Sequence, residues 1–406
     1  MKQDACLTWH LSALPFAARA QKADQKTLTV TADDERLTCE IYYDFHEKPL
    51  ILTGSQAPRI GDSVSLALMP HRIELYINGR LEDEEWPAGE RLWDAADAWI
   101  GVPAELSPTS PAEEEPPAVV GTFRSAEGWR PAERIFVGDC MPYVKDDRYH
   151  VLYLKDRRHH KSKWGLGAHQ WEHISTRDFD SWEIHPMAVA VTAPHEGSIC
   201  TGSWMRCEGR EYLFYTIRMS DRSPAHICRS ISEDGYHFRK DKAFCFTLSE
   251  KYHAVSARDP KVIRAADGLF HMFLTTSLQE SGRGCLAHLT STDLHTWREE
   301  ETPIYTAADA TQPECPDYIA FAGRYYLIYS LHGKAHYLIG EQPFGPWRAP
   351  KDPIIPCHSV PKGGVWGERI IFTGFRPLGG YAGTMTFVTA RAAENGELIF
   401  EREECI

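Results

Sequence analysis

A turn motif that repeats about every 50 residues is the feature that most restricts the fold of this chain. Each copy combines a Ser with an acidic residue and ends in an aromatic residue. The copies are residues 175–182, 232–238 and 291–297, and residues 343–347 end a further unit. Their last aromatic residues are 56, 59 and 50 positions apart, with short strand-like runs between them. Units of this length with about four short strands each are typical of propeller blades. Residues 119–406 therefore predict a five-bladed β-propeller.

The polar residues of the motif have a structural explanation. Ser and Asp side chains hydrogen-bond nearby backbone groups and so fix a turn. The large aromatic ring that follows, Trp182 or Trp297, is suited to packing between neighbouring sheets. We expect these motifs to shape the blades rather than to take part in chemistry.

Residues 1–106 predict a separate, smaller β-domain, because 406 residues exceed one ordinary core. Residues 27–30, 37–43 and 64–68 alternate apolar and polar side chains with the period of half-buried strands. Asn78-Gly79 between two such runs predicts a hairpin with a type I′ turn. The segment 75–86 resembles the hairpin of concanavalin-like and laminin-G-like β-sandwiches. Such a domain either binds carbohydrate or packs against its neighbour, and the absence of an aromatic platform favours packing.

Residues 107–118, rich in Pro and Glu, predict the linker between the two domains. The expected fold is therefore all-β: a β-sandwich at 1–106, the linker, and the propeller at 119–406.

Charge and composition exclude several classes of function. The formal net charge of −13 argues against binding to nucleic acid, and no run of 18 apolar residues is present to span a membrane. The first residues contain Asp4 and His10, which do not suit a signal peptide. Eleven scattered cysteines predict free thiols in a reducing cytoplasm. No CxxC or HExxH pattern occurs, so the sequence predicts neither a metal nor another cofactor.

Three acids, each followed by a strand-like run, fall in three different repeat units. They are Asp139, Asp259 and Glu314. If each lies on the innermost strand of its blade, all three point into the central funnel. Cleavage of a glycosidic bond needs one ionised and one protonated carboxyl group, and a third acid nearby raises the pKa of the proton donor. The sequence therefore predicts a sugar-cleaving site in the funnel.

These motifs, in this order over about residues 128–390, resemble glycoside hydrolase family 32, the invertase and fructanase family. Asp139 matches the nucleophile, Arg258-Asp259-Pro260 the motif whose acid stabilises the transition state, and Glu314-Cys315 the motif of the acid/base. Residues 169–182 are similar to the segment that closes the first blade. Residues 195–203 are similar to a substrate-pocket segment.

The resemblance implies a retaining β-fructofuranosidase that acts on sucrose or fructans without a cofactor. Asp139 would attack the anomeric carbon while Glu314 protonates the leaving oxygen, and Glu314 would then activate water. Asp259 would hold sugar hydroxyls. The further candidates for substrate binding are Arg258, Trp164, His169, Ser203, Arg218 and Asp317. No sequence feature predicts the oligomeric state.

Two departures leave alternatives open. The first motif of the family reads Asn-Asp-Pro-Asn-Gly, whereas residues 137–142 read Val-Gly-Asp-Cys-Met-Pro. Typical members also carry their β-sandwich after the propeller rather than before it. One alternative is an inverting arabinosidase or xylosidase of the family 43 type, with carboxyl groups roughly 6.5–9.5 Å apart. The other is a propeller that binds carbohydrate without cleaving it.

Overall fold

The computed structural model describes residues 4–44, 47–69, 72–85, 87, 90–108, 128–131, 135–157, 169–190, 196–219 and 221–401. The regular structure in these ranges is β-strand, apart from one short 3-10 helix, η2 (Ala254–Ser256). The chain divides into two compact units. One contains strands β1–β10, and the other contains residues 128–157, 169–190 and 199–401 of the described chain. No helix of the described residues is both long and apolar enough to cross a membrane.

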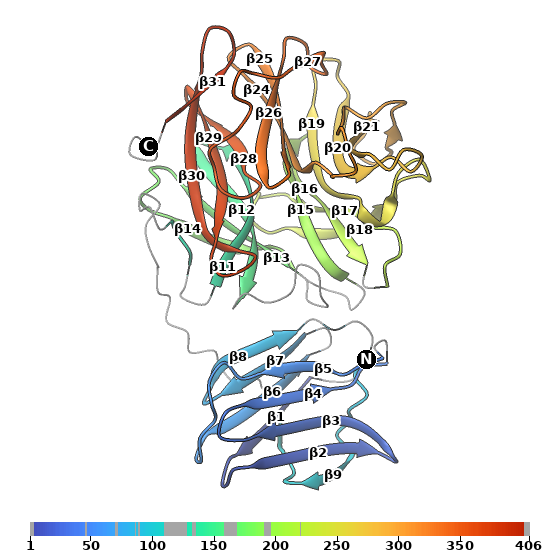
Figure 1. Ribbon diagram of the computed structural model, residues 1–406, viewed down its shortest axis with the longest axis vertical. Coiled ribbons are helices and arrows are strands. Elements are labelled where there is room, and N and C mark those ends of the chain that lie inside the picture. The colour runs from blue at the N-terminus through green and yellow to red at the C-terminus, as the bar shows by residue number, and fades with distance from the viewer. Residues whose placement is uncertain are drawn as a thin grey trace. The chain divides into compact units, whose positions relative to one another are not determined.

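The first unit is a β-sandwich of two antiparallel sheets (Figure 1). One sheet has the order β10-β1-β6-β7-β8 and the other the order β5-β4-β3-β2-β9. Alternate side chains of both sheets, such as Val30 of β3 and Leu66 of β6, form one buried hydrophobic cluster. The strands are β1 (Ala5–His10), β2 (Phe16–Lys22), β3 (Gln25–Ala32), β4 (Leu37–Ile41), β5 (Leu50–Thr53), β6 (Ser63–Met69), β7 (Arg72–Ile77), β8 (Arg80–Glu85), β9 (Ala98–Gly101) and β10 (Glu105–Ser107).

The predicted hairpin joins β7 to β8. Asn78 and Gly79 have φ angles of 53° and 77°, the positive values that a type I′ turn requires at both central positions. This prediction is confirmed.

The second unit consists of five antiparallel blades, as the repeat predicts (Figure 1). The first blade contains β11 (Ile135–Lys145), β12 (Arg148–Arg157), β13 (Gln170–Thr176) and β14 (Glu183–Val189). The second contains β15 (Glu196–Cys207), β16 (Arg210–Met219), β17 (His226–Ser232) and β18 (Arg239–Phe246). The third contains β19 (Arg258–Arg264), β20 (Phe270–Ser277), β21 (Gly284–Ser291), β22 (Arg298–Glu299) and β23 (Tyr305–Thr306). The fourth contains β24 (Glu314–Phe321), β25 (Arg324–Leu331), β26 (Lys334–Gly340) and β27 (Trp347–Arg348), and the fifth contains β28 (Lys362–Trp366), β29 (Arg369–Pro377), β30 (Gly383–Ala392) and β31 (Leu398–Glu401).

The first and last blades are joined, which closes the ring. Val137 of β11 pairs with Gly383 of β30, so the two blades share one sheet. Trp129, upstream of β11, exchanges two backbone hydrogen bonds with Met385 of β30, at 3.0 and 2.7 Å. The predicted fold, a five-bladed propeller preceded by a β-sandwich, is confirmed.

The repeated turns have the geometry that the motif predicts. Asp178, Asp234 and Asp293 each accept two backbone N–H groups from the residues two and three positions later, at 2.7 to 2.9 Å. These hydrogen bonds lower the pKa of all three carboxyls, that of Asp293 to about 2. Trp182 packs against Phe387 of β30, and Trp297 packs against Phe214 of β16. Both aromatic residues therefore join neighbouring blades, as expected.

The predicted linker is described only at its start. Ser107 is the last residue of β10, and residues 109–118 lie outside the described ranges. The proposed domain boundaries thus stay a prediction.

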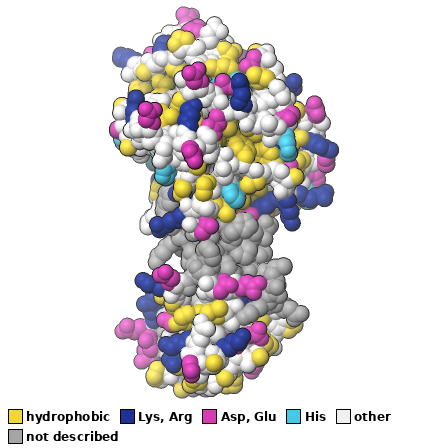
Figure 2. All heavy atoms as spheres, turned by 90° about the vertical axis from the view of Figure 1, so that its right-hand side faces the viewer, with side chains coloured by type: hydrophobic (Ala, Val, Ile, Leu, Met, Phe, Trp, Pro, Cys, Tyr) yellow, Lys and Arg dark blue, Asp and Glu magenta, His cyan; other side chains and the backbone are white. Residues whose placement is uncertain are grey.

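On the face shown in Figure 2, acidic and basic side chains are interspersed over the bladed unit.

Candidate active site

The three predicted acids lie on the first strands of three blades, at points where the strand pairing is irregular. The register shifts between Val137 and Cys140 in β11, between Arg258 and Lys261 in β19, and between Glu314 and Asp317 in β24. Such β-bulges bend a strand and turn a side chain away from its regular direction. The first strands contact one another, β11 with β28 and β24 with both β19 and β28. The three bulges therefore bring acids from different blades toward one centre.

The backbone at two of these bulges takes an unusual conformation. Asp259 has a φ of 59° and Cys315 a φ of 51°, both in the left-handed region that side chains with a Cβ rarely adopt. Strained residues of this kind concentrate at functional sites, where their surroundings hold them in place.

Asp139 is buried and is held by a tyrosine from the last blade. The Tyr381 hydroxyl donates a hydrogen bond of 3.0 Å to Asp139 Oδ1 and accepts one of 3.3 Å from the Asp139 backbone N–H. Burial, and then the nearby Asp139 carboxylate, raise the pKa of Tyr381 well above its usual value, so its proton stays available for donation. The preceding residue must be small, because a Cβ on Gly138 would lie 2.5 Å from the Tyr381 oxygen. Tyr381 was not among the predicted site residues.

Asp259 is buried with both carboxylate oxygens already bonded. Thr201 Oγ1 donates to Oδ1 at 2.7 Å, and the backbone N–H of Cys315 donates to Oδ2 at 3.1 Å. Arg258 Nε lies 3.6 Å from Oδ2. These bonds come from β15, β24 and β19, so three blades fix the orientation of this carboxylate.

Cys315 lies between the two aspartates. Its Sγ is 3.7 Å from Asp139 Oδ2 and 3.5 Å from Asp259 Oδ2. Burial, followed by the charges of both aspartates, raises the pKa of the thiol well above its usual value. The sulfur therefore keeps its proton and can donate it to either carboxylate. The Glu-Cys pair was noted in the sequence, but this bridging position was not predicted.

Glu314 is connected to Asp259 through Arg258. The guanidinium Nη2 lies 2.9 Å from Glu314 Oε1, and Nη1 donates to Gln312 Oε1 at 2.5 Å. Burial lowers the pKa of Arg258, but the Asp259 and Glu314 carboxylates outweigh it, and the net shift is upward. The Glu314 side chain is 39% exposed, whereas that of Asp259 is 4% exposed. Glu314 is thus the most accessible of the three acids.

Of the other predicted residues, His169 lies beside Tyr381 and Arg218 lies on β16 of the second blade. The buried His169 ring is 5.1 Å from the Tyr381 ring, and so is separated from Asp139 by one residue. Arg218 is half-buried on β16, and its charge acts on the Cys200 thiol of β15. Trp164 lies outside the described residues.

Ser203 and Asp317 are bonded to groups other than the three acids. The Ser203 hydroxyl donates to Pro260 O and accepts from Val262 N, both at 2.9 Å, which ties β15 to β19. Asp317 pairs with Lys261 at 2.5 Å and accepts the Gly363 N–H at 2.8 Å. Both residues line a cavity of about 300 Å³ between β11, β15, β19, β24 and β28. The structure therefore does not bring their polar atoms to the carboxylates.

Comparison with known proteins gives the family. The model of the glycosyl hydrolases family 32 N-terminal domain matches residues 140–344, half of the chain. Sucrose-6-phosphate hydrolase of Escherichia coli is 26% identical over 198 residues, which cover 46% of this chain and 39% of the relative. The enzyme of the same name from Zymomonas mobilis is 28% identical over 207 residues, which cover 46% of this chain and 40% of the relative. The chain thus spans about two fifths of the length of these relatives.

Solved structures show the same fold at low sequence identity. Fructan 1-exohydrolase IIa from Cichorium intybus superimposes with a TM-score of 0.55 at 17% identity, covering 70% of this chain and 61% of that structure. Sucrose-6-phosphate hydrolase from Lactobacillus gasseri gives 0.52 at 16% identity, covering 67% and 64%. A thermostable family-43 glycoside hydrolase gives 0.51 at 16% identity, covering 69% and 96%. The fold alone therefore does not separate the two hydrolase families, but the sequence match does. The chain belongs to glycoside hydrolase family 32.

Proposed function

We propose that this protein is a retaining glycoside hydrolase of the β-fructofuranosidase type that cleaves fructosyl linkages in sucrose or fructans. The observation that carries the proposal is the position of Asp139 and Asp259 on either side of the Cys315 sulfur, with Glu314 joined to Asp259 through Arg258. Family membership and the names of the relatives support a fructosyl substrate.

The hydrogen bonds favour Asp139 as the nucleophile. The Asp139 carboxylate receives hydrogen bonds from a side-chain hydroxyl and a thiol, those of Tyr381 and Cys315. Asp259, in contrast, is clamped by a hydroxyl and by a backbone N–H. A clamped carboxylate is suited to holding sugar hydroxyls in a fixed geometry, which stabilises the transition state. Asp139, which matches the nucleophile in the family motif, would then form the covalent intermediate.

The exposure of Glu314 favours it as the acid/base. This residue has to protonate the leaving oxygen and then take a proton from water, so it must reach both. Arg258, bonded to Glu314 and close to Asp259, would keep the two carboxylates in a fixed relation through the reaction.

The roles of Trp164, His169, Ser203, Arg218 and Asp317 in binding substrate stay predictions. His169 has the better support, because its ring contacts Tyr381 beside Asp139. The internal hydrogen bonds of Ser203 and the ion pair of Asp317 support a structural role instead.

The cytoplasmic location also stays a prediction. The ten cysteines of the described chain are free thiols.

The experiment measures release of fructose from sucrose, sucrose 6-phosphate, inulin and levan by the wild-type chain, Asp139→Asn and Glu314→Gln. The sugar phosphate is included because the curated relatives are sucrose-6-phosphate hydrolases. We expect at least one of these compounds to yield fructose with retained anomeric configuration, and both variants to lose activity. Inversion of configuration, or cleavage of arabinosides or xylosides in place of fructosides, would overturn the proposal. Binding of sugar without cleavage would indicate a carbohydrate-binding propeller.

A further inference from the structure

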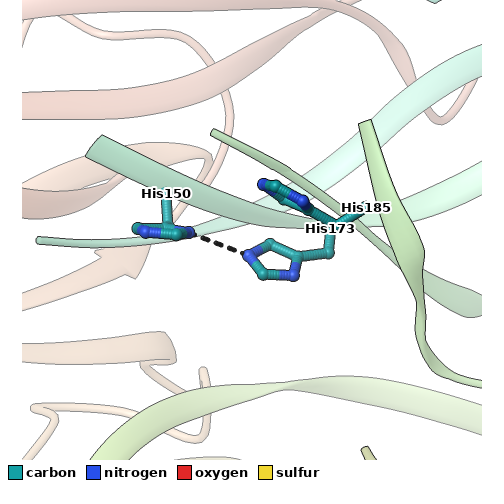
Figure 3. A group of neighbouring side chains, drawn as sticks. All are labelled: His150, His173 and His185. Atoms are coloured by element: carbon teal, nitrogen blue, oxygen red, sulfur yellow. Dashed lines mark hydrogen bonds between the residues drawn. The ribbon is translucent and has the colours of Figure 1, made fainter. Parts of the chain in front are cut away.

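Three buried histidines lie together in the first blade, away from the three acids. They are His150 on β12, His173 on β13 and His185 on β14 (Figure 3). His150 and His173 are fully buried, and His185 is 8% exposed. Each ring offers one nitrogen, and these three nitrogens lie within 4.8 Å of one another.

The pairing of the strands explains why the rings meet. His173 is directly opposite His185 in the β13–β14 pair. His150 is opposite Ser175, two residues beyond His173 on β13, and so lies diagonally across from His173 on the same face. Tyr143 of β11 is opposite His150 and adds a phenol to this face. Four neighbouring strands therefore present one polar group each to a common point.

Two of the distances in the cluster are close to those between the ligands of a metal ion. His150 Nδ1 and His173 Nε2 are 3.0 Å apart, and the Tyr143 hydroxyl is also 3.0 Å from His173 Nε2. A tetrahedral zinc ion with Zn–N bonds of about 2.0–2.1 Å separates its ligands by roughly 3.4 Å. Figure 3 shows His150 and His173 directed toward each other, with His185 beside His173. The three nitrogens lie within 4.8 Å of one another, so a bound ion would have to draw the rings closer together.

The cluster is buried and lies close to one charged side chain. Burial is the largest cause that lowers the pKa of each imidazole, that of His150 to about 3. Lys145, whose charge acts on all three rings, is paired with the buried Glu211 at 2.5 Å.

Hydrogen bonding within the described chain does not account for the whole cluster. His150 Nε2 and His173 Nδ1 are buried and have no hydrogen-bond partner among the described residues. The other nitrogens of these two rings, His150 Nδ1 and His173 Nε2, bond each other, and His185 Nε2 bonds the Ser175 hydroxyl at 2.7 Å. Buried polar atoms are normally paired, so the two unpaired nitrogens are unusual in a fully buried cluster. The second blade covers the cluster, because Trp204 of β15 stacks on Tyr143 at 4.4 Å and the Tyr236 ring lies 4.7 Å from His185.

We propose that His150, His173 and His185 bind a divalent transition metal of the zinc class, with the Tyr143 hydroxyl as the neighbouring fourth donor. Imidazole nitrogen is a preferred ligand of zinc, and closed sites of this kind are structural. The ion would tie β12, β13 and β14 together in the blade that carries Asp139. Its role is to stabilise this blade, and it takes no part in sugar cleavage.

The third blade provides a matched control. There, His271 Nδ1 and His288 Nε2 are 2.8 Å apart, so this pair resembles two members of the cluster. The other nitrogen of His271 is 3.1 Å from Asp267, and Phe344 stacks on the His271 ring at 4.1 Å. The group formed by His150, His173 and His185 is the one set of potential metal ligands found among the described residues, and the third blade is not part of it.

The test measures metal bound to the untagged chain after treatment with a chelator, dialysis against zinc and elemental analysis. We expect one zinc per chain in the wild type and in His288→Gln, and loss of that zinc in His173→Gln and His185→Gln. Gln keeps a similar size and can hydrogen-bond, but it is a poor zinc ligand. If the wild type retains no more zinc than His173→Gln, the proposal is overturned.

Two further measurements keep the proposal testable if His173→Gln does not fold. Added zinc should raise the thermal midpoint of the wild type and of His288→Gln, since a ligand that binds the folded state stabilises it, but not that of His185→Gln. Cobalt bound to the wild type should give the visible absorption of a tetrahedral site with nitrogen ligands. An octahedral cobalt spectrum, or an equal zinc effect in all variants, would mean surface binding only and would contradict the site.

Discussion

Two sets of carboxylates in the bladed unit illustrate the difference between a structural acid and a candidate catalytic one. Asp178, Asp234 and Asp293 lie at exposed turns and are satisfied by backbone N–H groups within three residues. Asp139 and Asp259 are buried at β-bulges and are held mainly by groups distant in sequence, such as Tyr381 and Thr201. The first set belongs to a turn motif with local hydrogen bonds that is repeated in three blades. The second set depends on contacts between different blades.

The largest difference should appear when the same substitution is made in both sets. Asp139→Asn should lower kcat by about 10⁴-fold or more, because the amide cannot form the covalent intermediate. Asp178→Asn should leave kcat within about twofold of wild type, since a surface change of this kind has small effects elsewhere. Initial rates of fructose release from the best substrate, with circular dichroism to verify folding, provide the measurement. Equal losses of kcat in the two variants would contradict the distinction between structural and catalytic acids.

Tyr381 tests whether the contacts made across the closed ring matter to the reaction. Tyr381→Phe removes the hydroxyl that bonds Asp139 and should lower kcat by about 10- to 100-fold, the effect of losing a hydrogen bond to a charged group. Tyr326→Phe is the control, because its hydroxyl bonds Gly396 O at 2.9 Å in another part of the unit. An unchanged kcat in Tyr381→Phe would show that this hydrogen bond only supports the fold.

Gly138 provides a second test of the contact between Tyr381 and Asp139. A Cβ at this position would lie 2.5 Å from the Tyr381 oxygen, so Gly138→Ala should displace the ring and lower kcat by about tenfold. In the Tyr381→Phe background the same change should cost much less, because the hydroxyl is already absent. Gly380→Ala, where a Cβ meets nothing within 4 Å, is the control in the Tyr381 loop. Fully additive effects on kcat would argue against the clash.

The smallest effect should be the pH dependence of a turn acid. The folded-state pKa of Asp293 is lowered to about 2, below the value of about 3.9 for an unfolded chain. Its stabilising effect is therefore present above about pH 4 and is lost as the pH falls toward 2. Asp293→Asn should lower the thermal midpoint by a few degrees at most at pH 7, because the group is exposed, and this difference should vanish near pH 2. If the difference in thermal midpoint between wild type and Asp293→Asn grows as the pH falls, the lowered pKa of Asp293 is contradicted.

The same contrast explains how much could be predicted from sequence. The blades and their turns were predictable because each Ser-Asp-aromatic motif forms its hydrogen bonds within three residues and recurs at a regular spacing. The hairpin at Asn78-Gly79 was predictable for the same local reason. Asp139, Asp259 and Glu314 were predicted because each is followed by a strand-like run and matches a family motif.

The contacts around those acids were not predictable, because they depend on how distant segments meet. Tyr381 is 242 residues from Asp139 and becomes its neighbour only through closure of the last blade onto the first. Cys315 was noted as a motif residue, but its place between two aspartates depends on bulges in three strands. His150, His173 and His185 lie on three strands at spacings that no local metal-binding pattern covers. The sequence therefore predicts no metal.

The central claim, that Asp139 is the nucleophile of a retaining reaction, is tested most directly by trapping the intermediate. Glu314→Gln is mixed with a fructosyl fluoride, whose leaving group needs no protonation, then quenched in acid, digested and analysed by mass spectrometry. The account predicts a fructosyl group covalently attached to the peptide that contains Asp139, and no such adduct in Asp139→Asn. A fructosyl adduct on another carboxylate, or continued fructose release by Asp139→Asn, would contradict it.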